Sequence, residues 1–564
     1  MSEASTAGSE RARLGLLSVF ALSFTLLFAL HTPLLRLPYF WDEAGHFVPA
    51  ARDLLLTADP IPTSTLSNAH PPLLTGFLAL WWKLGTFAPA STRTAMLLVA
   101  ALALTGLFRL ARQVSSLEVA VAATICTALY PVFFAQSSMV HLDMAAAALT
   151  LWGLSFYLED RRWLSLALFA AAALAKETAI VAPFALLLWE LVRPMVARRW
   201  AVLNPGSARR SASLSLLWLA ALPLALWFAY HAHRTGYVLG NPEFVRYNLS
   251  ATLDPLRILL AGLRRLWHLT GYMNLWLLTG VTVLAMRRPA LRDGPRERPR
   301  IDFRVQAVFA ALILAYAVMV SVLGGAVLAR YLLPVTPLVI LLCVSTVRRR
   351  LRHWLWVVSL VCAGFVAGLF VNPLYPFAPE DNLAYRDSII LHWRAADFLI
   401  AKYPSARVLT AWPATDELTK PYLGYVREPH AVVAVENFSA ASLAAAARDR
   451  SRYDVALVFS TKYQPPYNLF DLLPFWERLQ ERYFDYHRDL SAEETARLLG
   501  GRVVWREQRR GEWVAVIEMD RVLNARNLTA DLLGYTRILQ EKRTPKDTKG
   551  TRRKESAFIR VDPR

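Results

Sequence analysis

Long runs of apolar residues without a single charge constrain this chain more than any other feature of its sequence. Three of these runs are 14–30, 211–228 and 305–323. About 17–25 such residues are enough for a helix to cross the hydrocarbon core of a bilayer. Apolar residues make up 55% of the 564-residue chain, and the mean hydropathy is +0.32, more than an ordinary soluble enzyme carries. The sequence therefore predicts an α-helical polytopic membrane protein.

The formal net charge of +20 is concentrated in short arginine tracts between these runs. The tracts are 193–210, 287–304 and 348–352. Basic loops beside membrane spans mark the cytoplasmic side, where they also contact anionic lipid. The charge thus indicates a membrane surface and no nucleic acid partner. We place about eleven spans, with the N-terminus in the cytoplasm. They lie near 14–30, 94–110, 118–135, 144–158, 163–175, 178–192, 211–229, 266–286, 305–323, 331–347 and 354–371.

One further apolar stretch, 72–87, is left out of this count. If it crossed the membrane, every later loop would change sides and the arginine tracts would face outward. It also contains Lys83 and two tryptophans, which suit an interface better than the centre of a bilayer. We therefore expect an interfacial or re-entrant helix here, within a first outer loop that spans 31–93.

The chain changes character after the last apolar run. We predict a membrane-embedded domain over 1–371, a small α/β domain on the outer face over 372–520, and a basic, disordered tail over 521–564. Within the second domain, the pattern of apolar residues predicts a helix over 386–402. It also predicts strands at 408–412 and 455–460 and a hairpin that pairs 502–506 with 514–518.

Two adjacent carboxylates, Asp42 and Glu43, follow the first span in an aromatic setting. Burial beside apolar rings raises the pKa of a carboxylate and makes it a better general base. Alternatively, Asp42 caps a helix over 44–56 and Glu43 favours the dipole of that helix. Both interpretations stay open from this string alone.

Four further polar groups fall at the mouths of predicted spans. His70 precedes two prolines and either binds a phosphate or lies in the headgroup layer. Asp143, in a short loop with His141, is a functional group or a helix cap. Lys176 is a phosphate ligand or forms an ion pair with Glu177. Arg330 clamps a phosphate or snorkels to the interface. The predicted topology puts all of them, with Asp42 and Glu43, on the outer face.

The order of these strings resembles the GT-C membrane glycosyltransferases, and within them the protein O-mannosyltransferase and lipid A aminoarabinose transferase superfamily. The strings are Asp42-Glu43, then His70-Pro71-Pro72-Leu73, His141-Leu142-Asp143-Met144, Leu174-Ala175-Lys176-Glu177 and Arg330-Tyr331-Leu332-Leu333-Pro334. The resemblance covers about residues 10–370. It implies an inverting transfer of a sugar from a polyprenyl-phosphate donor to a protein, lipid or glycan acceptor.

The resemblance also implies roles for individual residues. Asp42 matches the carboxylate that activates the acceptor, and Asp143 lies in the same cavity; Glu43 completes the expected catalytic group. His70, Lys176 and Arg330 are expected to bind the donor phosphate. His70 stands where some relatives have lysine, and Glu177 stands where many have glycine. A divalent metal ion held by Asp42, Glu43 and Asp143 stays open, because sets of oxygen ligands are not identified by spacing.

A membrane transporter of a lipid-linked or anionic substrate is the alternative function. Transporters often contain inverted repeats and broken helices that meet near the middle of the bilayer. This chain has no matched halves, and its polar residues gather at one face. The sequence therefore favours the transferase.

Overall fold

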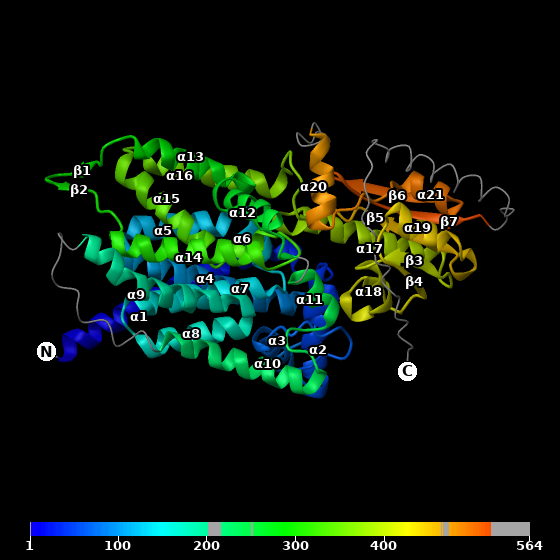
Figure 1. The fold of residues 1–564 in the computed structure, drawn as a ribbon, viewed down its shortest axis with the longest axis horizontal. Helices are drawn as coiled ribbons and strands as arrows, with labels where there is room; N and C mark the ends of the chain where they lie inside the picture. The colour runs from blue at the N-terminus through cyan, green and yellow to red at the C-terminus, as the bar shows by residue number, and fades with distance from the viewer. Residues whose placement is uncertain (1, 201–215, 250–251, 464, 466–472, 521–564) are drawn as a thin grey trace, which may run out of the picture.

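The computed structural model describes residues 2–200, 216–249, 252–463, 465 and 473–520. The predicted disordered tail, 521–564, lies outside the described residues. Most of the chain forms a bundle of helices, followed by a small domain built on a β-sheet (Figure 1). The fold class predicted from the sequence is thus confirmed.

The bundle begins with α1 (Ser2–His31) and ends with α16 (Trp354–Phe370). Between them lie α2 (Val48–Thr57), α3 (Leu73–Leu84), α4 (Pro89–Val114), α5 (Leu117–Leu129), α6 (Pro131–Gln136), α7 (Leu142–Leu158), α8 (Arg162–Ala175), α9 (Val181–Trp200), α10 (Leu222–Thr235), α11 (Pro242–Asn248), α12 (Pro255–Thr270), α13 (Leu275–Met286), α14 (Phe303–Val322) and α15 (Thr336–Arg350). Short helical turns that matter for the site are η2 (Glu43–Phe47), η3 (Glu177–Ile180), η9 (Ala329–Leu332) and η10 (Pro379–Asp381).

Small residues let the central helices pack closely. Helix α7 contains four consecutive alanines, 145–148, and packs between α4 and α8. Gly106 of α4 leaves room for the indole of Trp152, because a Cβ there would lie 2.7 Å from the ring. Short side chains at helix contacts are typical of membrane bundles, where close backbone approach replaces the hydrophobic effect.

Four helical segments among the described residues are long and apolar enough to cross a membrane. They are Gly15–Leu34, Pro89–Val114, Pro255–Met286 and Phe303–Val322, and each overlaps a predicted span. The protein is therefore a multi-pass membrane protein. Other predicted spans fall on shorter apolar helices such as α5, α7, α8 and α16, and part of the run 211–229 lies outside the described residues. The count of about eleven spans stays a prediction.

Helix α3 occupies most of the stretch 72–87 that we left out of the count. Its 12 residues rise about 18 Å along the helix axis, which is shorter than a hydrocarbon core of about 30 Å. The helix packs against α2. Its length agrees with an interfacial or re-entrant helix, and its place in the membrane stays a prediction.

The C-terminal sheet has five strands in the order β4-β3-β5-β7-β6. Strands β3 (Val408–Ala411), β4 (Val432–Val435) and β5 (Val455–Phe459) are parallel, while β6 (Gly501–Arg509) and β7 (Glu512–Met519) form an antiparallel hairpin. The helices of this domain are α17 (Ala384–Lys402), α18 (Ala414–Thr419), α19 (Ala440–Ala447), α20 (Pro474–Phe484) and α21 (Ala492–Leu499). The predicted helix, two strands and hairpin are confirmed; β4 was missed.

Local sequence explains these elements. Strand β5 is buried at every position, as its unbroken apolar run requires of a central strand. The hairpin turns at Arg510 and Gly511, both with positive φ, which suits the twist of the flanking strands. Helix α21 begins with a capping box between Ser491 and Glu494.

The sheet domain docks on the first loop of the bundle. The backbone N–H of Tyr39 donates to the carbonyl of Leu423 at 3.1 Å, and the hydroxyl of Tyr425 donates to the carbonyl of Tyr39 at 3.0 Å. Figure 1 shows the sheet at one end of the bundle and the basic loop with strands β1 (Arg292–Asp293) and β2 (Arg296–Glu297) at the other. The loop that carries Asp42 is thus held between the helices and the sheet.

Candidate active site

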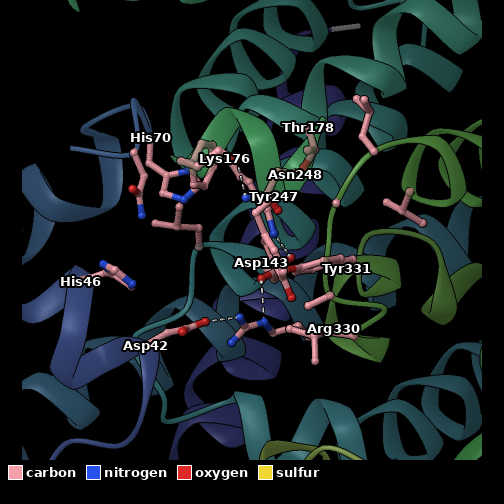
Figure 2. Close-up of a pocket in the computed structure, with 18 of the residues that line it drawn as sticks. Asp42, His46, His70, Asp143, Lys176, Thr178, Tyr247, Asn248, Arg330 and Tyr331 are labelled. Atoms are coloured by element: carbon pink, nitrogen blue, oxygen red, sulfur yellow. Dashed lines mark hydrogen bonds and ion pairs between the residues drawn. The ribbon is translucent and has the colours of Figure 1, made fainter. Parts of the chain in front are cut away.

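A cavity of about 860 Å³ lies where the bundle meets the sheet domain. Five of the six residues that the sequence predicted line it: Asp42, His70, Asp143, Lys176 and Arg330. His70 lies in the loop before α3 and the other four lie at or beside the ends of different helices, so that segments up to 288 positions apart meet (Figure 2). The sixth, Glu43, lies elsewhere.

Arg330, in η9, is the centre of the charged cluster. Its guanidinium binds Asp42 at short range and the carboxylate of Asp143 at 3.6 Å (Figure 2). It also binds the carboxylate of Glu380 at 3.0 Å. Its side chain is only 4% exposed. Because a charge is buried at this cost only when it is paired, the alternative of an arginine that snorkels to the interface is wrong.

His141 adds a fourth contact to Arg330. Its Nδ1 lies 2.6 Å from the amide oxygen of Gln136, and its Nε2 lies 2.8 Å from Nη1 of Arg330. A neutral ring can satisfy both contacts if Nδ1 donates and Nε2 accepts. Burial, aided by the neighbouring Arg330, lowers the pKa of His141 well below its usual range. The ring is therefore neutral and acts as an acceptor that fixes Arg330.

Asp42 precedes η2 and makes no capping hydrogen bond with its side chain. The alternative that Asp42 merely caps a helix is therefore wrong. Burial raises the pKa of this carboxyl, but the attraction of Arg330 outweighs it, so the pKa lies below its usual range. Trp41, just before it, has φ of +45°, a left-handed conformation that costs a bulky residue about 1–3 kcal/mol. The strained turn at Trp41 directs Asp42 into the cavity.

Lys176 and Asp143 form a second ion pair beside Arg330. Nζ of Lys176 lies 2.6 Å from the Asp143 carboxylate and 4.1 Å from the centre of the Tyr331 ring. Asp143 lies in the first turn of α7, whose N-cap residue is His141. The alternatives of a capping Asp143 and of a Lys176–Glu177 pair are both wrong.

His70 is paired with Glu177 at 3.0 Å. The pKa of Glu177 is lowered to about 2, because His70 and Lys176 attract its charge more strongly than burial opposes it. His70 lines the cavity, but its Nδ1 is already occupied. Glu177, which stands where many relatives have glycine, thus orients His70. Lys176 pairs with Asp143 instead of with Glu177.

Glu43 was predicted to belong to the catalytic group, and its position corrects that prediction. It is fully buried and does not line the cavity. Its carboxylate accepts from the backbone N–H groups of Phe40 and Val140 at 2.8 and 2.7 Å and pairs with buried Arg93 at 3.3 Å. Glu43 therefore joins three segments around the cavity. Consequently Asp42, Glu43 and Asp143 do not converge, and no group of three His, Cys, Asp or Glu side chains suited to a metal occurs among the described residues.

Glu380, in η10, is a site residue that the sequence analysis missed. It follows the last apolar helix in a proline-rich exit, and no spacing rule links it to Arg330. Burial raises the pKa of Glu380 to about 8; Arg330 opposes the rise and Asp42 adds to it. Glu380 thus adds a third acidic side chain to the contacts of Arg330, beside Asp42 and Asp143.

The rest of the cavity wall consists of two parts that differ in their side chains. Apolar side chains from α11 and α14 and from the residues that follow these helices line one part: Phe244, Val245, Leu249, Met319, Val320, Leu323 and Leu328. The sheet domain supplies Trp412, Thr461 and Lys462 to another. The cavity thus has an apolar wall, a charged centre and an aromatic end.

Comparisons with known proteins bear on this site. Residues 69–227 match the family model described as dolichyl-phosphate-mannose-protein mannosyltransferase. The resemblance to this mannosyltransferase family is confirmed. The segment that resembles the mannosyltransferases contains His70, Asp143 and Lys176, whereas Asp42 and Arg330 lie outside it. No curated protein matches the chain.

Solved structures of glycosyltransferases are also similar to the chain. ArnT from Cupriavidus metallidurans bound to undecaprenyl phosphate is 15% identical, with 89% of this chain and 98% of that chain covered and a TM-score of 0.47. The oligosaccharyltransferase of Archaeoglobus fulgidus, tethered with an acceptor peptide, is 13% identical, with 79% and 69% covered and a TM-score of 0.36.

Proposed function

We propose that the protein is an inverting glycosyltransferase that moves a sugar from a polyprenyl-phosphate donor to a protein, lipid or glycan acceptor. The observation that carries the proposal is the contact of Arg330 with both Asp42 and Asp143 in a cavity that also contains Lys176. A base and two phosphate ligands then lie within one site. The confirmed resemblance to a mannosyltransferase family supports the same class of reaction.

The donor phosphate binds between Lys176 and Arg330, with His70 at the edge. Arginine can hold two phosphate oxygens at once, and lysine supplies a compact charge. The polyprenyl chain lies along the apolar part of the wall beside α14, a predicted span. The lipid therefore stays in the bilayer, while the reacting carbon lies in the charged centre.

Asp42 acts as the general base. An acceptor hydroxyl oxygen attacks the anomeric carbon and its proton goes to the Asp42 carboxylate. The bond from that carbon to the phosphate oxygen breaks, and the electron pair leaves with polyprenyl phosphate. Arg330 and Lys176 stabilise the charge that develops on the leaving phosphate. Inversion follows because the hydroxyl attacks opposite the phosphate.

Donor binding activates this base. Without a donor, Arg330 holds the pKa of Asp42 low, which makes the carboxylate a weak base. A phosphate anion that shares Arg330 offsets the positive charge, and burial then raises the pKa of Asp42. Asp42 thus becomes a stronger base only when the donor is present.

The site faces outward in the proposed topology, in a bacterial plasma membrane with a cytoplasmic N-terminus. Support comes from the position of the basic loop with β1 and β2, at the opposite end of the bundle from the sheet domain (Figure 1). Arginine-rich loops stay on the cytoplasmic side. The cavity and the sheet domain then lie on the extracytoplasmic side.

Asp42→Asn tests the proposal in proteoliposomes that contain polyprenyl-phosphate sugars. The amide keeps the shape and a contact to Arg330 but accepts no proton, so we expect sugar transfer to fall by at least about 100-fold. Asp59→Asn is the matched control, because Asp59 lies in the same loop but pairs with Arg234 at the surface. Full transfer by Asp42→Asn would contradict the assignment, provided that both variants melt like the wild type.

A further inference from the structure

The aromatic end of the cavity is built by the sheet domain. Trp412 follows β3, and Thr461 and Lys462 follow β5; β3 and β5 are parallel neighbours. The carboxyl ends of these two strands therefore open on the cavity. In open sheets with parallel strands, ligands bind in the crevice at the carboxyl ends.

Two indoles form a corner at this end. The rings of Trp41 and Trp412 lie 5.2 Å apart at 78° to each other, and the ring of His46 lies 5.9 Å from that of Trp412. The indole of Trp412 lies directly on Gly45, since a Cβ there would be 2.6 Å from its Nε1. Gly45 thus admits Trp412 to the cavity, and the Asp42 loop and the sheet domain together make the corner.

We propose that Trp41 and Trp412 form a carbohydrate-binding subsite that takes the sugar ring of the donor. The apolar C–H face of a sugar packs on one indole while the edge of the other closes the corner. His46 and Asp42 border the same space and offer polar partners for hydroxyl groups. The subsite rests on the proposed transferase function and gives the sheet domain a role in it.

The position of the corner favours the donor sugar as its occupant. Trp41 directly precedes Asp42 in the chain, and Asp42 contacts Arg330, the proposed phosphate ligand. A sugar linked to that phosphate can therefore reach the two indoles while it stays beside Asp42, the proposed base. Trp41 also keeps its left-handed backbone conformation, which glycine would adopt without strain. The chain thus carries a strained tryptophan at a position where glycine would be unstrained.

Binding to the full-length protein in nanodiscs tests the subsite. The probes are undecaprenyl phosphate and a panel of undecaprenyl phosphates that carry a hexose, a pentose or an amino sugar. We expect the wild type to bind at least one sugar-bearing carrier more tightly than undecaprenyl phosphate. Trp412→Ala should reduce that preference by about 2- to 10-fold, the size expected for one aromatic contact, and leave the affinity for undecaprenyl phosphate unchanged.

Two further variants separate the subsite from a folding defect. Gly45→Ala keeps both indoles but displaces Trp412, and Trp41→Gly removes a ring while it relieves backbone strain. Both should lose the sugar preference and keep the wild-type affinity for undecaprenyl phosphate, which a folding defect would lower. Trp393→Ala, at an exposed position of the same domain, is the matched control and should keep the preference.

The outcomes distinguish this subsite from the proposed function. Equal weakening of undecaprenyl phosphate and of the sugar-bearing carriers by Trp412→Ala would overturn the subsite. A wild type that binds every carrier equally would also overturn it and leave the phosphate site intact. A wild type that binds no undecaprenyl phosphate would instead remove the proposed function itself.

Discussion

Glu43→Ala should destabilise the fold, although the sequence pairs this residue with the proposed base. The substitution leaves the guanidinium of Arg93 fully buried without its carboxylate, which costs about 3–5 kcal/mol. It also removes the acceptor for the N–H groups of Phe40 and Val140, at about 1–3 kcal/mol each. Arg93 keeps the carbonyl of Pro38 at 2.8 Å, so we expect a total at the lower end of this sum, about 5 kcal/mol.

Thermal unfolding of the purified protein in detergent measures this loss. Glu43→Ala should melt well below the wild type, and Glu43→Gln, which keeps the shape and one acceptor oxygen, should lose less. The double variant Glu43→Ala/Arg93→Met should recover part of the loss, because it removes the unpaired charge. A Glu43→Gln variant that melts like the wild type but transfers no sugar would refute the structural role and restore a chemical one.

Two other predictions concern charge and topology. Glu380 has a pKa raised from 4.5 to about 8, so its contribution to stability is complete below about pH 4.5 and is lost as the pH rises to about 8. The melting temperature of Glu380→Gln should therefore rise relative to that of the wild type from pH 5 to 8, and a constant difference would argue against the raised pKa. For topology, a cysteine at exposed Thr86 should react with an impermeant reagent from outside, while one at exposed Asp293 should react only after permeabilisation; the reverse pattern would invert the proposed orientation.

The sequence was most informative where one residue pattern has one physical meaning. A run of apolar residues without charge must be shielded from water, so the helical bundle and its long apolar helices could be predicted. The sheet could be predicted because apolar residues alternate with polar ones in β6 and β7 and form an unbroken run in β5, and these residues must also be shielded from water. Strand β4 was missed because only part of its surface is buried, and its four residues carry little pattern.

Contacts between distant segments could not be predicted from spacing. Glu380 and Arg330 are 50 positions apart, and nothing in the proline-rich exit indicates that its carboxylate turns back to the guanidinium. The position of Trp412 in the cavity wall could not be predicted either, because a tryptophan at the end of a strand is usually part of a core. The pairing of Lys176 with Asp143, in place of its neighbour Glu177, also depends on how α7 and α8 pack.

The Asp42–Glu43 pair shows how an informative string can still be assigned incorrectly at one position. Successive residues of a helical turn point about 100° apart, so two adjacent carboxylates at a helix start do not face the same ligand. Here Asp42 points to Arg330 in the cavity, whereas Glu43 points to Arg93 in the core. An adjacent pair of this kind is therefore better suited to two tasks than to one: the second carboxylate fixes the loop, and the fixed loop presents the first to the substrate.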